Sequence, residues 1–216
     1  MREPVVFGAS YSVYVRIVRL ALEEKGVPYR VSEVDIFASG GPPADYLERH
    51  PFARIPAFEH GDFHLYESGA ITRYIDEAFP GPMLQPEEPR RRARLNQIIS
   101  VLDNYAYRSM VWDIFVERVR APQNGRVPNE ERIASALPRA ETCLRALQDI
   151  KGKDRWLTGA TLTLADLHAA PIFAYFCMAP EGAALLARYA DLQQWWHRMA
   201  VRPSMAATRS PLEGAL

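Results

Sequence analysis

The sequence is poor in cysteine and carries no excess of either charge. Its two cysteines, Cys143 and Cys177, form no CxxC pair, which excludes a dithiol redox motif and a disulfide-rich scaffold. We interpret both as small apolar residues of the core. The 26 basic residues equal the 26 acidic ones, so no overall field favours nucleic acid or an anionic membrane surface. Neither is therefore expected as a partner.

Long apolar runs and metal-ligand spacings are also missing. The first residues, MREPVVFG, contain no apolar signal core, and no stretch approaches the roughly 18 apolar residues of a membrane span. Asp166 and His168 interrupt the most apolar segment, LADLHAAPIFAYFCMAP. We therefore expect a cytoplasmic protein. His60 and His64 are four residues apart, but a Gly-Asp turn separates them, so no metal site is expected.

The first 79 residues alternate between strand and helix signals. Short apolar or alternating runs predict strands, whereas apolar residues at helical spacing predict helices. The expected order is strand 4–7, helix 13–25 ended by Gly26, strand 29–36, helix 43–49, strands 56–59 and 62–65, and helix 67–78. This βαβαββα order predicts a small four-stranded mixed sheet with helices on its faces.

A proline-rich stretch follows, and everything after it is predicted to be helical. PGPMLQPEEP, residues 80–89, holds four prolines in ten residues, which is typical of a linker. Helices are expected over 88–119, 128–150, 163–178, 181–188 and 191–200. We therefore predict two domains, an α/β domain over 1–79 and an all-α domain over 90–216.

Three hydroxyl-bearing residues crowd the expected start of helix 13–25. Ser10, Tyr11 and Ser12 follow the first strand in the sequence VFGASYSVYV. A serine at this point can cap the helix. A hydroxyl beside a helix N-terminus can also stabilise an anion, because the helix dipole adds to its hydrogen bond. The residues alone leave both interpretations open.

Two further motifs combine a turn with polar residues. In RHPFARIPAF, Pro56 begins a strand, either as an ordinary edge proline or with a cis bond after Ile55. In LYESGAITRYI, Glu67 and Ser68 open a helix, whose free N–H groups and dipole suit a small carboxylate. The Ser68 hydroxyl is a further donor, and Glu67 can receive an ammonium group. The alternative is that both residues only cap the helix.

Taken in order, these motifs resemble those of the cytosolic glutathione S-transferases. The resemblance rests on the hydroxyls before VRLALEEKGVPY, on HPFARIPAF and on ESGAITRYI, and it covers nearly the whole chain. TLTLADLHAAPIFAYF resembles the family's motif in its helical domain, with Thr163 and Asp166 as a structural capping box. MVWDIFVER has a faint similarity to phi-like plant and bacterial members, which does not assign a class.

The resemblance implies a thioredoxin-like N-terminal domain that binds glutathione and a helical domain that supplies most of the second-substrate pocket. It implies that the Ile55 backbone pairs antiparallel with the cysteinyl unit of glutathione, with Pro56 cis. It also implies that Glu67 and Ser68 hold the γ-glutamyl end. Arg54 falls beside this strip, where it either meets a glutathione carboxylate or is simply solvated. The family pattern implies a homodimer as well, and no metal.

By the same resemblance, Ser12 is the residue that contacts the glutathione thiol. The position used by the tyrosine-dependent members holds Phe7-Gly8, and no cysteine stands in the loop. A free thiol has a pKa of about 8.5, and lowering it by about two units takes roughly 2.7 kcal/mol. A charge-assisted hydrogen bond from Ser12 together with a helix N-terminus is of that size. The alternative is that Ser12 is only the helix cap.

The second-substrate pocket is expected to involve the long helix that starts near residue 88. Tyr105, Arg108 and Trp112 share one face of an α-helix by their i, i+3, i+7 spacing, and Tyr11 can reach toward them. The alternative is that these side chains belong to the core or to a dimer interface. The loop FASGGPP lacks the basic residue that many relatives place there for the glycyl carboxylate.

We therefore expect a transferase that conjugates the glutathione thiolate, as co-substrate, to a small hydrophobic electrophile. A non-catalytic binding or interaction protein with the same fold is one alternative, and the missing basic residues in 37–44 favour it. A glutathione-dependent isomerase, dehalogenase or peroxidase is another, since these share the thiolate chemistry. ASYSVYV lacks the paired serines and cysteine of the maleylacetoacetate isomerases.

Overall fold

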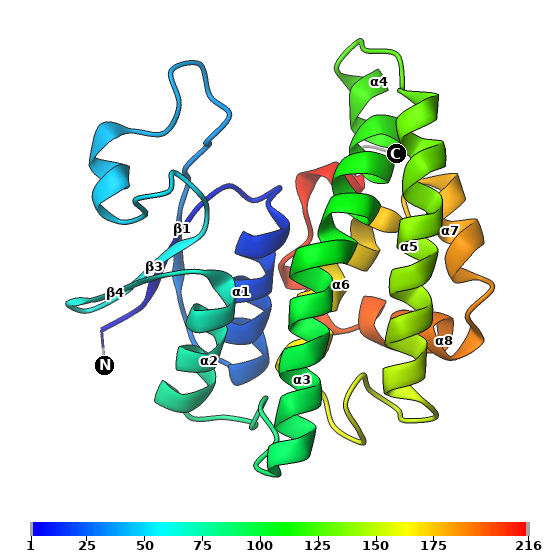
Figure 1. Cartoon of the computed structure of the whole chain (residues 1–216). Coiled ribbons are helices and arrows are strands. Elements are labelled where there is room, and N and C mark those ends of the chain that lie inside the picture. Colours follow the sequence, from blue (N-terminus) through cyan, green and yellow to red (C-terminus); the bar gives the residue numbers. More distant parts are fainter. Residues whose placement is uncertain (1, 215–216) are drawn as a thin grey trace. The chain divides into compact units, whose positions relative to one another are not determined.

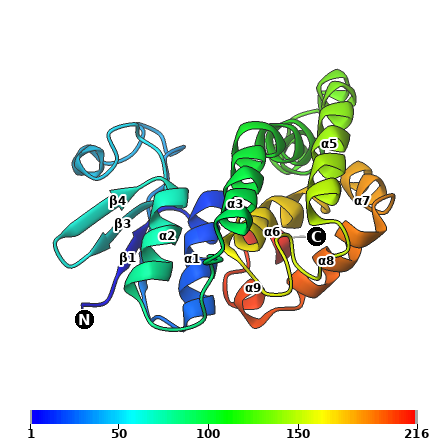
Figure 2. The ribbon, with the colours of Figure 1, turned by 60° about the horizontal axis from the view of Figure 1, so that its bottom comes forward.

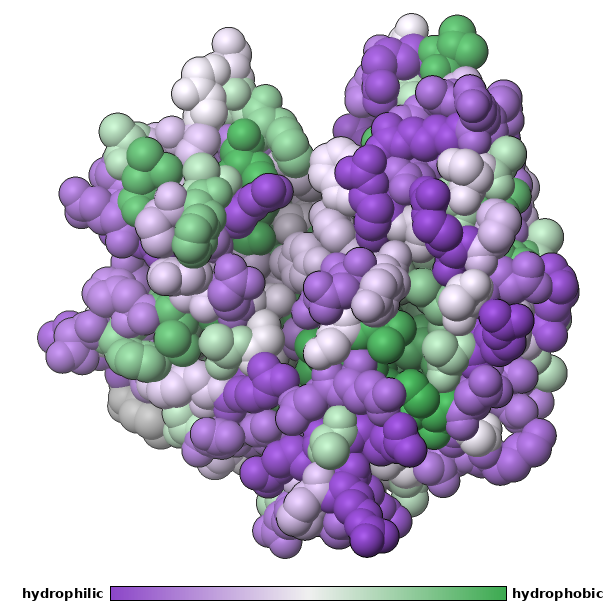
Figure 3. All heavy atoms as spheres, viewed as in Figure 1, coloured by the Kyte–Doolittle hydropathy of each residue, from purple (hydrophilic) through white to green (hydrophobic). Residues whose placement is uncertain are grey.

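The computed structural model describes residues 2–214, and the chain divides into two compact units (Figure 1). Unit 1 combines Met1–Leu84 with Pro203–Leu216, and unit 2 is Gln85–Arg202. Hydrophilic residues cover much of the face shown in Figure 3, and hydrophobic residues form smaller patches between them. Within the described part of the chain, no helix is long and apolar enough to cross a bilayer.

Unit 1 is built on a four-stranded mixed sheet. Its strands are β1 (Val5–Phe7), β2 (Arg30–Ser32), β3 (Ala57–His60) and β4 (Phe63–Tyr66), in the order β2-β1-β3-β4. β1 is parallel to β2 and antiparallel to β3, and β3 pairs antiparallel with β4. The predicted mixed sheet is therefore confirmed.

Two helices pack together against this sheet (Figure 2), α1 (Val13–Lys25) and α2 (Ser68–Ala78). α1 buries Val15, Val18 and Leu22 completely, as their helical spacing predicts. It ends at Gly26, whose φ of 67° suits glycine because that region crowds a side chain. The predicted bounds 13–25 of this helix are confirmed.

The segment between β2 and β3 departs from the predicted pattern. β2 ends at Ser32, although alternation predicted a strand over 29–36. The carboxylates of Glu33 and Asp35 accept hydrogen bonds from the backbone N–H groups of Ser10 and Phe37, so the chain leaves the ladder there. The helix predicted over 43–49 is a 3₁₀ turn, η1 (Ala44–Glu48).

The end of the chain belongs to unit 1, whereas the sequence analysis placed it in the helical domain. This segment contains α9 (Pro203–Ala207) and η3 (Pro211–Gly214). Arg16, on α1, is only 3% exposed and needs partners for its charge. Its guanidinium donates to the Met205 carbonyl at 3.1 Å and to Thr208 Oγ1 at 3.3 Å, and it pairs with Glu213. The predicted division into a domain 1–79, a linker 80–89 and a domain 90–216 stays a prediction for the way the chain folds.

The regular elements of unit 2 are all helices among the residues described. They are α3 (Pro89–Val101), η2 (Leu102–Arg120), α4 (Ala121–Gln123), α5 (Glu130–Lys151), α6 (Leu164–Phe176), α7 (Pro180–Leu186) and α8 (Ala190–Ala200). Every residue of α6 is buried, and α6 packs against α3, η2 and α8. This central place explains why the sequence of α6 is apolar on all sides. The predicted helix 88–119 is continuous, but residues 102–120 are wound as a π-helix.

Candidate functional site

The sheet brings the three motif segments of unit 1 to one edge. Phe7 at the end of β1 lies opposite Ala57, and Ala57 lies opposite Tyr66 at the end of β4. Three segments therefore leave the sheet side by side: the one after Phe7, the one before Ala57 and the one after Tyr66. These are the turn 8–12, the segment 54–56 and the start of α2, which carry the six residues predicted to bind glutathione: Ser12, Arg54, Ile55, Pro56, Glu67 and Ser68.

Gly8 lets the first two of these segments approach closely. Its φ of 151° disfavours any residue with a side chain. A Cβ atom at Gly8 would lie 2.4 Å from Cγ2 of Val15 and 3.1 Å from Cβ of Ile55. The turn before α1 therefore lies directly against Ile55.

Ser12 is both the cap of α1 and a possible donor. Its Oγ accepts one long hydrogen bond, 3.4 Å from the Val15 N–H, and the residue is half-buried. A hydroxyl that accepts a hydrogen bond still holds a proton to donate. The capping interpretation is thus correct, and it leaves the donor role available to Ser12.

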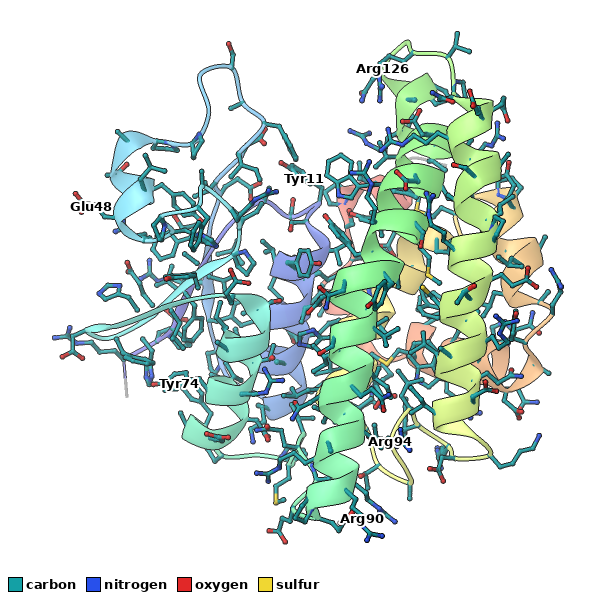
Figure 4. All side chains as sticks on the ribbon, in the orientation of Figure 1. Tyr11, Glu48, Tyr74, Arg90, Arg94 and Arg126 are labelled. Atoms are coloured by element: carbon teal, nitrogen blue, oxygen red, sulfur yellow. The ribbon has the colours of Figure 1, made fainter. Side chains whose placement is uncertain are left out.

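Tyr11 and Ser10 are tied to the segment after β2. Tyr11 lies at the turn between β1 and α1 (Figure 4). Its hydroxyl donates to Oδ1 of Asp35 over 2.6 Å, and its ring stacks on Phe37 with centroids 6.3 Å apart. The Ser10 N–H donates to Glu33. The proton of Tyr11 is therefore directed to a carboxylate of the same unit.

The backbone at Ile55 is shaped for pairing. The Ile55–Pro56 bond is cis, as the resemblance implied. Ile55 lies two residues before Ala57, where β3 begins, and no backbone hydrogen bond joins it to another described residue. The Arg54 carbonyl next to it accepts a 2.7 Å hydrogen bond from the Tyr46 hydroxyl. Burial raises the pKa of Tyr46 to about 12, so this donor keeps its proton at physiological pH.

The start of α2 offers unsatisfied donors and a strained acidic residue. Glu67 has a φ of 70°, unusual for a residue with a side chain, and its exposed carboxylate makes no capping hydrogen bond. Ser68, the first residue of α2, is 6% exposed. The first N–H groups of a helix have no partner within it, and the dipole adds positive potential. This arrangement suits a carboxylate and an ammonium group side by side.

The residues predicted for the second-substrate pocket lie on η2, whose winding differs from that assumed. The prediction that Tyr105, Arg108 and Trp112 share one face assumed the α-helical period. A π-helix has a different period, so this spacing no longer places them on one face. Tyr105 is 64% exposed, and Trp112 is half-buried. Arg108 contacts the buried carboxylate of Asp113 at 3.1 Å. Their role in a pocket stays a prediction.

Two family models match the chain in succession. They describe the N-terminal domain of glutathione S-transferases over residues 6–83 and the C-terminal domain over 94–203. "Probable glutathione S-transferase GSTF1" of rice (Oryza sativa subsp. japonica) is 30% identical over 95% of this chain and 96% of its own. Glutathione S-transferase F13 of Arabidopsis thaliana is 28% identical over 92% and 91%. The chain belongs to the glutathione S-transferase family.

Solved structures of the family share the fold throughout. Glutathione S-transferase III in its apo form aligns with a TM-score of 0.86 at 26% identity, over 97% of this chain and 98% of that one. Glutathione S-transferase I from maize, solved with an atrazine glutathione conjugate, gives 0.85 at 25% identity over 99% of both chains. Glutathione S-transferase-I bound with lactoylglutathione gives 0.85 at 26%, over 96% and 98%. The expected thioredoxin-like domain and all-helical domain are confirmed.

In this glutathione S-transferase, Asp166 has the structural position that its motif predicts. Oδ2 of Asp166 accepts from the Thr163 N–H at 2.8 Å and from its hydroxyl at 3.0 Å, which completes the predicted capping box. Oδ1 accepts from the Leu157 N–H at 2.9 Å and from Trp195 Nε1 at 2.8 Å. Asp166 thus joins the loop before α6 to α8.

The two thiols of this glutathione S-transferase are poorly suited to act as nucleophiles. Burial raises the pKa of Cys177 to about 12 and raises that of Cys143, so both stay protonated. Among the described residues, no group of three or more His, Cys, Asp or Glu side chains could hold a metal ion.

Sequence reasoning missed four residues that shape the site: Glu33, Asp35, Tyr46 and His50. The sequence analysis assigned Glu33 and Asp35 to the strand 29–36. Two acidic residues shortly before the turn residues of FASGGPP were the available sign that the strand ends earlier. The Tyr46 hydroxyl reaches the Arg54 carbonyl across a turn, and the His50 ring lies against that of Tyr66, and neither contact follows a helical or strand spacing.

Proposed function

We propose that the protein is a glutathione transferase that joins the glutathione thiolate to a small hydrophobic electrophile. One observation carries this proposal. At one edge of the sheet, the turn with the Ser12 hydroxyl, the unpaired backbone of Ile55 and the start of α2 lie side by side. The names of the relatives support it, as do two similar structures solved with glutathione conjugates or lactoylglutathione.

Each part of glutathione has a matching group in unit 1. The Ile55 backbone, ahead of Pro56, pairs with the cysteinyl unit as an added strand. Glu67 receives the γ-glutamyl ammonium, while Ser68 and the α2 N-terminus bind the γ-glutamyl carboxylate. Arg54 is exposed next to Ile55, where it can meet a carboxylate of the peptide. The glutathione-binding domain is 1–79.

Ser12 supplies the chemistry by stabilising the thiolate. Its hydroxyl proton donates to the sulfur, and the N-terminus of α1 adds positive potential, so the thiol loses its proton more readily. The sulfur lone pair then forms the bond to the electrophilic carbon, and the electron pair of the broken bond leaves with the leaving group or moves into the acceptor. Ser12 is a donor and forms no covalent bond itself.

We assign Tyr105, Arg108 and Trp112 of the helical domain, 90–216, to binding of the hydrophobic substrate, and Tyr11 stays a predicted contact of that substrate. The proline-rich linker 80–89 joins the helical domain to the first domain. We propose that the protein is a cytoplasmic homodimer, as the resemblance to the family implies. Size-exclusion chromatography with light scattering would test the dimer.

The proposed function is tested by a pH titration of the ultraviolet thiolate absorbance of bound glutathione. In the wild type, the thiol pKa should fall about two units below its free value of about 8.5. Ser12→Ala should keep glutathione affinity within a few fold, return the thiol pKa toward the free value and lower turnover about a hundredfold. Ser10→Ala is the matched control, because Ser10 is bound in the same turn only through its backbone.

Two results would contradict the proposal. A bound thiol pKa that is the same in the wild type and in Ser12→Ala would remove Ser12 as the donor. Absence of saturable glutathione binding would favour the second candidate, a non-catalytic binding protein. The carboxylates of Glu33 and Asp35 beside the Ser12 turn favour that candidate, because they repel the carboxylates of glutathione.

A further inference from the structure

His50 is a buried histidine that the proposed chemistry does not use. It follows η1, and its backbone N–H donates to the Tyr46 carbonyl at 3.0 Å. Only 2% of its surface is exposed, and within the described chain its Nδ1 atom has no hydrogen-bond partner. A buried polar atom left without a partner costs roughly 1–3 kcal/mol. An apolar side chain would avoid that cost, so the presence of an imidazole points to a role.

The surroundings of His50 connect it to the proposed glutathione site. Its ring lies 4.9 Å from the ring of Tyr66, between centroids, and 6.3 Å from that of Phe52. Tyr66 is the last residue of β4 and directly precedes Glu67. The charged groups that act on the imidazole are Glu67 and Arg54, which are two of the proposed glutathione ligands. His50 therefore lies behind the junction of β4 and α2.

We propose that His50 is a positioning residue of the glutathione site, whose neutral imidazole leaves the Glu67 carboxylate available to the γ-glutamyl ammonium. A protonated His50 competes with that ammonium for Glu67, because a buried imidazolium needs an anionic partner. This inference rests on the proposed function and adds a pH dependence to glutathione binding.

The direction of the dependence follows from the charges. Burial lowers the pKa of His50 below 6.5, while Glu67 raises it and Arg54 lowers it. The imidazole is therefore neutral at physiological pH. When an ammonium group binds Glu67, it offsets the negative charge that raised the pKa of His50, so this pKa falls further. By linkage, protonation of His50 must then weaken binding by the same factor.

The test uses calorimetric titration with S-methylglutathione, which has no titratable thiol. Between about pH 5 and pH 7 its carboxylates stay ionised and its amino group stays largely protonated. The wild type should bind several-fold more weakly at pH 5 than at pH 7, approaching the tenfold limit that about one pKa unit of coupling sets. His50→Asn should vary less than about twofold over this range. His64→Asn, an exposed β4 histidine that contacts Glu59 at 3.2 Å, is the matched control and should keep the wild-type dependence.

A proton NMR titration of His50 gives a second readout that needs no change at this residue. Its pKa should fall in Glu67→Gln and on saturation of the wild type with S-methylglutathione. If S-methylglutathione binds but neither change moves the pKa of His50, this inference is overturned and the proposed function stands. If S-methylglutathione does not bind at pH 7, the proposed function is overturned, and this inference with it.

Discussion

Among the residues that the structure describes, two with side chains have positive φ, and both border the proposed glutathione site. Ala53, at 50°, ends the turn that precedes Arg54, and Glu67, at 70°, begins α2. Left-handed backbone costs an L-residue roughly 1–2 kcal/mol, and such strain is often found at binding sites. The strain fixes the direction in which Ile55 and Ser68 leave the sheet.

Ala53→Gly should therefore stabilise the protein. Glycine accepts the φ of 50° without strain, which outweighs the greater freedom of its unfolded chain, for a net gain of about 0.5–1 kcal/mol. The free energy of unfolding in urea measures the effect. Ala57→Gly, in β3 and 1% exposed, is the control and should destabilise instead. A loss of stability in Ala53→Gly would contradict the assignment of strain.

At the level of single residues, local motifs predicted what local geometry decides. Ser12, Pro56 and Asp166 each have a role that neighbouring residues define, as cap, turn and capping box. His50 and Tyr46 were not predicted, because their contacts with Tyr66 and Arg54 arise from turns of the chain and not from a helical or strand spacing. The burial of His50 beneath Tyr66 depends on strand pairing, which its own sequence neighbourhood does not encode.

At the level of elements, the Asp166 carboxylate joins α6 to the loop before it and to α8. Burial raises the pKa of Asp166, whereas the backbone donors of Leu157 and Thr163 and the indole N–H of Trp195 act in the opposite direction. These donors belong to the loop before α6, to its N-cap residue and to α8. Asp166 thus connects three segments of unit 2.

Asp166→Asn should cost about 3 kcal/mol of unfolding free energy or more. The amide replaces one acceptor oxygen with an NH₂ group, which then faces N–H donors that lose their partner in a buried place. Thermal and urea unfolding would measure the loss. Asp149→Asn, on the exposed side of α5, should change stability by less than about 0.5 kcal/mol. Equal effects of the two substitutions would show that the capping box carries little of the stability.

Element types were more predictable than element shapes. The helices of unit 2 follow their apolar periodicity, and so does α1. β2 is shorter than its alternation predicts, because the Glu33 and Asp35 side chains bind backbone N–H groups elsewhere. The π-winding of η2 has no signal in the sequence pattern that we can identify.

At the level of the whole molecule, unit 1 is discontinuous in sequence. Residues 203–214 supply the partners of the buried Arg16, and Ser204 donates to Glu24 on the same helix. Arg16 lies among the apolar residues of α1, and this charge was the available sign that another segment must supply an acceptor. Reading the chain in order assigned its end to the preceding helices, since distant pairing is not visible in local patterns.

Deletion of residues 203–216 should destabilise α1 selectively. Arg16 would lose its contacts with Met205, Thr208 and Glu213, and breaking a buried ion pair costs roughly 3–5 kcal/mol. Hydrogen exchange should show amides of α1 exchanging at least a hundredfold faster, with amides of α6 unchanged. Glu213→Gln in the full chain, which removes one partner only, should give a smaller effect in the same direction. Uniform acceleration in both helices would contradict a selective role.

The discontinuity of unit 1 also sets an order of events during protein synthesis. A ribosome makes the chain from its N-terminus, so all of Gln85–Arg202 is available before Pro203–Ala207 emerges. Unit 2 can complete its packing before Arg16 makes its contacts with Met205, Thr208 and Glu213. The packing of α9 against α1, the helix that Ser12 caps, therefore forms only after the whole of unit 2 has been translated.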